Sequence, residues 1–207
     1  MALVTAAQAR LALPGLTGTG EDTNIGTVIA RVGAIFARWC GYPPASAGAV
    51  CTMESTSYTL YSGHAGHVDV LEGRYLRLRV WPVTAISAIY DDPNEAYGTA
   101  VTASLYEIVD GNEGLVRYTI AGGGAWSEPS DAFTRAIKVS CTAGFSTVPA
   151  DLEHAAVMMT KHLWNLRHTA GKSNVNAGQS SAQVRDEEIP AAVREVLGRF
   201  RLPGAVW

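Results

Sequence analysis

The clearest strand pattern in the chain is Arg74-Tyr-Leu-Arg-Leu-Arg-Val-Trp-Pro-Val-Thr-Ala-Ile-Ser-Ala-Ile-Tyr90. Polar and apolar residues alternate from Arg74 to Val80, which is the period of a half-buried strand. A second predicted strand runs from Val83 to Tyr90, and the turn-forming residues 91–94 end it. These two strands place β structure in the middle of the chain.

Three more strands are predicted after this stretch. They cover Leu105–Val109, Leu115–Ile120 and Ala136–Thr142. Asp110-Gly-Asn-Glu-Gly114 has the composition of a hairpin turn, and residues 122–129 form a glycine-rich loop. Because strands joined by short hairpins are normally antiparallel, we expect an antiparallel β region.

Helical spacing appears on the N-terminal side of this region. Thr5 can cap a short helix that extends to about Leu11. The next helix ends at Gly41, before a pair of prolines. Its apolar residues fall on one face at helical spacing, namely Ile25, Val28, Ile29, Val32, Ile35, Phe36 and Trp39.

Helical spacing returns on the C-terminal side. A long helix follows Pro149, with acidic residues in its first turn, and its stripe is Leu152, Ala156, Met159, Leu163 and Leu166. A polar, unpatterned loop is predicted for residues 169–188. A final short helix starts near Pro190, and its apolar face is Val193, Val196, Leu197 and Phe200.

The predicted fold class is therefore α+β, with a small helical bundle from both chain ends and an antiparallel β insertion. The chain of 207 residues is long enough to bury a core as one domain. We expect a single domain, residues 1–207, with a helical frame of 1–49 and 146–207 and a β-rich insertion of 50–145.

Composition excludes several classes of function. The net charge is −3 and no run of basic residues occurs, which disfavours strong binding to nucleic acid. Nowhere do eighteen apolar residues run together, so no membrane span is expected. Cys40, Cys51 and Cys141 form neither a CxxC motif nor an even set, which favours a reducing compartment.

Catalytic motifs are absent from the sequence, and no cofactor is expected. Gly171-Lys-Ser173 resembles the end of a phosphate-binding loop, but Leu166 stands where that motif needs glycine. His64 and His67 lie three apart in a loop with Asp69 nearby, without a third fixed ligand. We predict a protein that is not an enzyme, and the alternative is a small metal-dependent hydrolase using the His64/His67 loop.

Two tryptophans are candidates for contact with a partner. Trp207 ends the chain after an apolar tail, and Trp126 lies in the glycine-rich loop. A buried Trp removes roughly 150–250 Å² from water, so an exposed one favours an interface. Packing within the subunit and contact with a partner both stay open for each of them.

The order of these parts resembles one family. The matching stretches are Thr5-Ala-Ala-Gln-Ala-Arg-Leu11, Trp39-Cys-Gly-Tyr-Pro43 after the helix from Ile25, Leu78-Arg-Val-Trp-Pro-Val-Thr-Ala-Ile-Ser-Ala-Ile-Tyr-Asp-Asp92, Tyr106-Glu-Ile108 on to Leu115, Val139-Ser-Cys-Thr-Ala-Gly-Phe-Ser-Thr-Val-Pro149, and Ile189-Pro-Ala-Ala-Val-Arg-Glu-Val-Leu-Gly-Arg-Phe-Arg201. In this order the chain resembles the head–tail connector (adaptor) proteins of long-tailed phages. Residues 51–73 match less well than the rest.

The resemblance implies a structural role. Such connectors form a dodecameric ring beneath the portal, extend the DNA channel, and give a stopper or tail protein its docking face. DNA would pass without specific binding, and the particle would be a phage or a gene transfer agent assembled in the bacterial host cytoplasm. A tail-terminator, another neck or tail component, is a further alternative.

Two contact surfaces follow as expectations. The end of the chain is expected to contact the portal or the neighbouring subunit, through Arg199, Phe200, Arg201, Leu202, Pro203, Val206 and Trp207. The β insertion, with the loop that carries Trp126, is expected on the tailward or outer face.

Overall fold

The computed structural model describes most of the chain. The described residues are 3–13, 15–16, 18–46, 48–63, 67–119, 125–127, 134–169, 174–177, 180–183 and 189–202. They divide into two compact units. One unit is helical and combines residues 1–40 with 148–201, and the other holds residues 41–147 together with Leu202.

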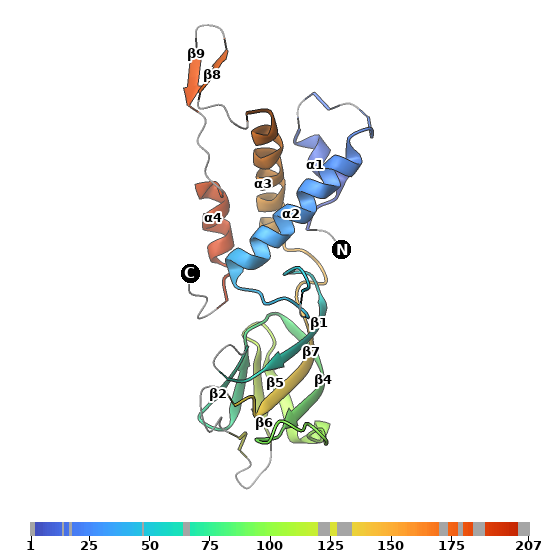
Figure 1. Ribbon diagram of the computed structural model, residues 1–207, viewed down its shortest axis with the longest axis vertical. Helices are drawn as coiled ribbons and strands as arrows, with labels where there is room; N and C mark the ends of the chain where they lie inside the picture. Colours follow the sequence, from blue (N-terminus) through green and yellow to red (C-terminus); the bar gives the residue numbers. More distant parts are fainter. Residues whose placement is uncertain are drawn as a thin grey trace. The chain divides into compact units, whose positions relative to one another are not determined.

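The helical unit is built from both ends of the chain. Its helices are α1 (Ala6–Leu11), α2 (Asp22–Cys40), α3 (Ala150–Thr169) and α4 (Ala191–Gly198). Helix α2 packs against the other three, and α3 also contacts α1 and α4 (Figure 1). Gly41, at φ +86, takes the left-handed conformation that ends α2, as the sequence predicts.

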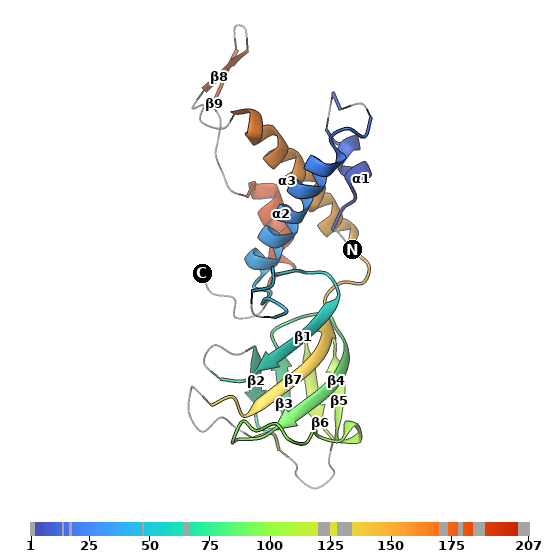
Figure 2. The same cartoon turned by 45° about the vertical axis from the view of Figure 1, so that its right-hand side comes forward.

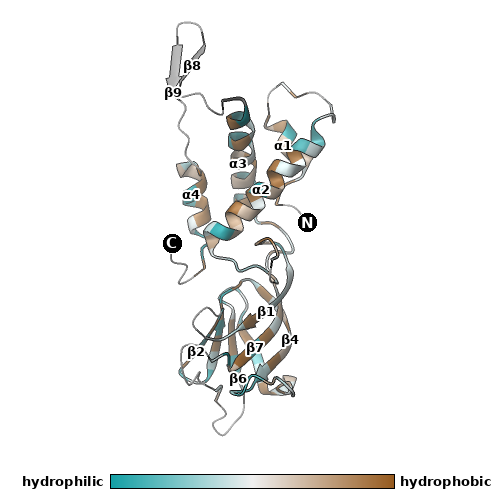
Figure 3. Ribbon diagram, in the orientation of Figure 1, coloured by the Kyte–Doolittle hydropathy of each residue, from teal (hydrophilic) through white to brown (hydrophobic). Residues whose placement is uncertain are grey.

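Amphipathic spacing explains which helix faces are buried. The predicted stripe of α2 contributes the buried Ile25, Ile29, Val32 and Phe36. On α3 the predicted Leu152, Ala156 and Met159 are buried, whereas Leu163 is only half-buried and Trp164 lies in the core instead. Figure 3 shows hydrophobic and hydrophilic residues alternating along these helices.

The second unit holds two antiparallel sheets. One has the order β1 (Thr56–Tyr61), β7 (Ile137–Ala143), β4 (Val83–Asp91), and Figure 2 shows these strands side by side. The other has the order β2 (Val68–Leu71), β3 (Tyr75–Leu78), β6 (Leu115–Tyr118), β5 (Tyr106–Asp110). A single-turn 3₁₀ helix, Ala103–Leu105, leads into β5.

One hydrophobic core joins the two sheets of this unit. On β7 alternate residues face inward, so that Ile137, Val139 and Cys141 are buried while the residues between them face outward. The other members of the core are Tyr58, Leu60, Val68, Leu76, Leu78, Val80, Val83, Ile89, Val116, Trp126, Ala136 and Ala143. The α+β class, with helices from both ends and antiparallel strands between them, is thus confirmed.

The turn between β5 and β6 lies where the sequence predicts it. Gly114 has φ +64, and a Cβ at this position would lie 2.4 Å from the carbonyl oxygen of Leu78. The same close approach lets the Leu78 N–H donate to the Gly114 carbonyl at 2.8 Å. Only glycine fits here, because its backbone must enter the left-handed region while it touches β3.

Two predictions about elements need correction. Strands β1 and β2 lie in residues 51–73, for which no strand was predicted. The segment 169–188, predicted as an irregular loop, contains a hairpin of β8 (Asn174–Ala177) and β9 (Ser180–Gln183). Four-residue strands such as β2, β8 and β9 are too short to show a hydrophobic period, and backbone pairing defines them instead.

Candidate functional site

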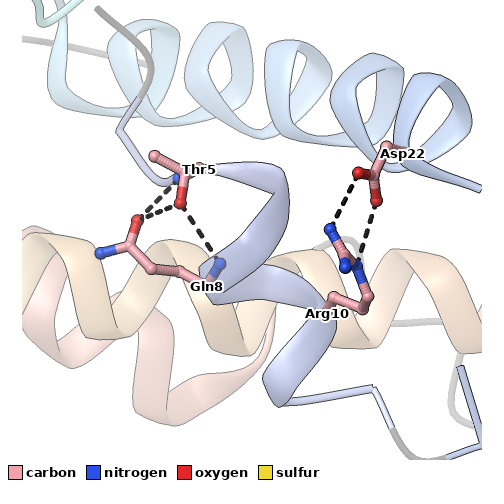
Figure 4. Close-up of polar contacts among 4 residues, drawn as sticks. All are labelled: Thr5, Gln8, Arg10 and Asp22. Carbon is pink, nitrogen blue, oxygen red and sulfur yellow. Dashed lines mark hydrogen bonds and ion pairs between the residues drawn. The ribbon is translucent and has the colours of Figure 1, made fainter. Parts of the chain in front are cut away.

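Helix α1 is held firmly at its start by a capping box. The Thr5 side chain accepts a hydrogen bond from the Gln8 N–H at 3.2 Å, and the Gln8 side chain accepts from the Thr5 N–H at 2.8 Å (Figure 4). These bonds satisfy backbone donors that the first turn of a helix leaves free. The capping role predicted for Thr5 is confirmed.

Side chains also fasten α1 to its neighbours. Arg10 donates two hydrogen bonds to the Asp22 carboxylate, from Nε at 3.1 Å and from Nη2 at 2.8 Å (Figure 4). The Gln8 amide donates to Glu153 at the start of α3. A bidentate arginine–carboxylate pair restricts direction as well as distance, so the last turn of α1 has a defined position on α2.

Leu11 projects from this fastened turn into solvent. Its exposed fraction is 91%, the largest among the exposed large hydrophobic residues described. A single exposed leucine is ordinary on a protein surface. Leu11 directly follows Arg10, whose ion pair with Asp22 holds the backbone of this turn in a defined position.

Among the described residues, three other large apolar side chains are exposed, all in the β-rich unit. Val50 is 70% exposed and precedes β1, whereas Val109 and Ile108 are 49% and 36% exposed on β5. Strand β5 is an edge of its sheet. Sequence reasoning missed these residues and Leu11, because no one-dimensional pattern separates an exposed leucine at a helix end from a buried one.

The predicted contact segment at the chain end is partly described. Arg199 pairs with Asp151 at 3.1 Å, Phe200 is half-buried and Arg201 is exposed. Leu202 is only 4% exposed, so its side chain already has partners within the subunit. Pro203, Val206 and Trp207 lie outside the described residues.

Trp126 is a core residue of the β-rich unit. Its side chain is 2% exposed, its ring meets the Tyr118 ring edge-on at 4.7 Å, and its Nε1–H donates to the Arg74 carbonyl at 3.1 Å. Of the two roles open for this side chain, the structure shows packing within the subunit. Where its loop faces in an assembly stays a prediction.

The loop of the alternative hydrolase hypothesis is described at His67 only, because His64 lies outside the described residues. The His67 N–H donates to the Tyr61 carbonyl, and its own carbonyl accepts from the Arg79 N–H, both at 2.8 Å. Burial lowers the pKa of His67, with a further lowering by Arg79, which outweighs the opposing effect of Asp69. Asp69 is engaged in a bidentate pair with Arg79. Among the described residues no three His, Cys, Asp or Glu gather as metal ligands would.

The three thiols have different surroundings. Cys40 is buried in the helical unit and Cys141 in the β-rich unit, while Cys51 is half-buried. Burial raises the pKa of Cys40 and of Cys141 to about 12, so both stay protonated near neutral pH. A thiol must ionise to act as a nucleophile, and these two therefore behave as small apolar residues.

The chain belongs to the head completion protein family, whose model matches residues 4–202. The expected structural role as a head–tail connector is thus confirmed, and neither the hydrolase nor the tail-terminator alternative is favoured.

A solved structure shares the fold. The chain is similar to one in the structure described as the neck of an empty GTA (gene transfer agent) particle computed with C6 symmetry. The TM-score is 0.58 and the identity 18%, covering 97% of this chain and 90% of the other. A comparison with curated protein sequences finds no match. No helix in the described part of the chain is long and apolar enough to cross a membrane.

Proposed function

We propose that this protein is the adaptor subunit in the neck of a tailed phage or gene transfer agent. Copies assemble into a ring beneath the portal, in the host cytoplasm, and the ring continues the DNA channel toward the stopper or tail. Membership of the head completion family and the fold shared with a neck component support this role. The subunit acts by binding rather than by catalysis, and it works as a single connector domain.

The exposure of Leu11 is the observation that supports a contact between neighbouring subunits of the ring. In a cyclic ring, one face of each copy meets a different face of the next copy. An apolar side chain on a rigid turn suits such a contact, because burying a leucine contributes about 1.5–3 kcal/mol and the backbone that carries it is already ordered. The fastening of α1 by Arg10 and Gln8 provides that rigidity.

The portal contact is proposed for the chain end. Its members are Arg199, Phe200, Arg201, Leu202, Pro203, Val206 and Trp207. The described part offers an exposed Arg201 and a half-buried Phe200 next to the anchored Leu202. We further propose that the loop carrying Trp126 lies on the tailward or outer face of the ring. Residues other than Trp126 would make the contacts there.

The test is assembly on purified portal, viewed by electron microscopy. We expect Leu11→Asp to prevent ring closure while the subunit stays folded, since this position is solvent-exposed. Leu11→Met serves as the matched control and should assemble like the wild type. Normal rings from Leu11→Asp would exclude Leu11 from the contact.

A second variant addresses the portal. Removing Pro203–Trp207 should abolish docking on the portal, and particles indistinguishable from the wild type would refute the proposed portal contact. Subunits that never associate with the portal, wild type included, would refute the adaptor role itself.

A further inference from the structure

Three tyrosines surround a lysine on the outward face of the three-stranded sheet. Tyr61 on β1, Lys138 on β7 and Tyr90 on β4 are cross-strand neighbours in register. Tyr97 comes from the loop after β4 and lies over the group, with its ring 6.0 Å from that of Tyr61 and 6.3 Å from that of Tyr90. We call these four residues, with Arg135, the tyrosine cluster.

The two cations of the cluster rest on aromatic rings. Lys138 Nζ lies 4.9 Å from the Tyr90 ring centroid and 5.3 Å from that of Tyr97, and the Arg135 guanidinium lies 5.4 Å from that of Tyr61. Cation–π contacts orient both groups. Within the described part of the chain neither cation forms an ion pair with a carboxylate, so both keep N–H donors for another acceptor.

The nearby carboxylates are occupied in building the loop. Asp92 accepts the N–H groups of Asn94 and Tyr97, each at 2.9 Å, and Glu95 accepts the N–H of Arg135 at 2.9 Å. Asp91 accepts the N–H of Ser127. In the described part of the chain these carboxylates therefore bond to backbone N–H groups and not to the Lys138 ammonium or the Arg135 guanidinium.

The loop adopts a strained backbone to place Tyr97. Glu95 and Tyr97 have φ of +59 and +49, values that non-glycine residues rarely adopt. Such a backbone conformation is unfavourable and persists only where surrounding contacts impose it. Here the contacts are the Asp92 and Glu95 hydrogen bonds and the bond from the Tyr97 hydroxyl to the Arg135 carbonyl.

We propose that the tyrosine cluster is a docking surface for an acidic, extended segment of a partner protein in the particle. A partner carboxylate would accept hydrogen bonds from Lys138 and Arg135, while apolar atoms beside it would lie on the tyrosine rings. Nucleic acid fits less well. Duplex DNA carries one negative charge per about 1.7 Å, and two cations would neutralise only a few of its phosphates.

This inference rests on the proposed function only in taking the partner to be another protein of the neck. Its test uses the isolated full-length subunit and needs no portal, so it can fail while the assembly test succeeds. The probe is a capped hexapeptide of alternating leucine and glutamate, and the control peptide has glutamine in place of glutamate. Binding is followed by the NMR signals of labelled tyrosine rings.

We expect the glutamate peptide to shift the signals of the clustered tyrosines, and the glutamine peptide to leave them unchanged. Lys138→Gln or Arg135→Gln should weaken binding about tenfold, the value of one charge-assisted hydrogen bond. Lys161→Gln is the matched control, because Lys161 is an exposed lysine on α3. Binding should also weaken as salt is raised, through screening.

Three results would overturn the proposal. The first is that the tyrosine signals do not shift at millimolar peptide, and the second is that both peptides shift them equally. The third is that the Lys161→Gln control loses as much binding as Lys138→Gln or Arg135→Gln. The surface would be assigned to nucleic acid instead if a duplex DNA oligonucleotide shifted the same signals more strongly and the Lys138→Gln variant no longer showed these shifts. Circular dichroism of each variant shows whether it remains folded. If Lys138→Gln does not fold, Arg135→Gln still tests the proposal, because Arg135 is at an exposed position.

Discussion

Single glycines in this chain have opposite roles according to what surrounds them. A Cβ built on Gly33, inside α2, meets nothing within 4 Å, whereas one on Gly114 meets the Leu78 carbonyl oxygen at 2.4 Å. Glycine within a helix costs stability relative to alanine, and at a left-handed turn it is the residue that fits. The two positions therefore form a matched pair.

Substituting each glycine by alanine tests this contrast. We expect Gly33→Ala to raise the free energy of unfolding of the monomer by about 0.5–1 kcal/mol. Gly114→Ala should lower it by about 1–3 kcal/mol, through the close contact and the positive φ. Urea denaturation measures both, and a stabilised Gly114→Ala would contradict the described turn.

At the scale of elements, Trp126 connects residues 125–127 to the four-stranded sheet, where its ring contacts Tyr118 of β6. The Trp126 N–H donates to the Gly73 carbonyl at 2.7 Å, and the indole adds a hydrogen bond to the Arg74 carbonyl. We expect Trp126→Ala to cost about 3–5 kcal/mol, and Trp126→Phe to cost less because a ring still fills the space. Chemical denaturation is the measurement, and a neutral Trp126→Ala would show that this side chain is not part of the core.

His67 joins the end of β1 to the end of β3 and makes stability depend on pH. Its folded pKa lies below the usual 6.5, so the unfolded chain binds more protons as the pH falls through 6.5 toward the folded value. The free energy of unfolding should therefore fall as the pH drops from about 7 through 6.5, and His67→Gln should flatten this part of the profile. His154→Gln, at an exposed position, is the control and should leave the slope in place.

At the scale of the whole molecule, the chain divides into two compact units, and each contains one buried cysteine. Cys40 reports on the helical unit and Cys141 on the β-rich unit. In the native protein we expect a thiol reagent to modify the half-buried Cys51 first and to leave the other two protected.

Denaturant should then expose the two buried thiols in separate steps. Trp126→Ala should shift the labelling midpoint of Cys141 and leave that of Cys40 nearly unchanged, because Trp126 and Cys141 belong to the same core cluster of the β-rich unit. Pulse labelling followed by mass spectrometry of peptides resolves the sites. A common shift of both midpoints would mean that the chain unfolds as one cooperative block.

The sequence by itself determined the helices, most of the strands and the class of protein. Helical spacing around Ile29 and alternation around Leu76 are local properties, since each depends only on the period of one element. The capping role of Thr5 and the turn at Gly114 are local in the same sense, and the order of such elements along the chain carried the resemblance to the connector family.

Only the tertiary structure decided which residues are presented to partners. Leu11 and Leu13 look alike in the sequence, yet one is 91% exposed and the other 4%. Trp126 looked free in its glycine-rich loop and is buried, whereas the tyrosine cluster joins three strands and a loop through register that no single segment encodes. Exposure and cross-strand contact depend on residues far apart in the chain, which is why a reading of local periods could not supply them.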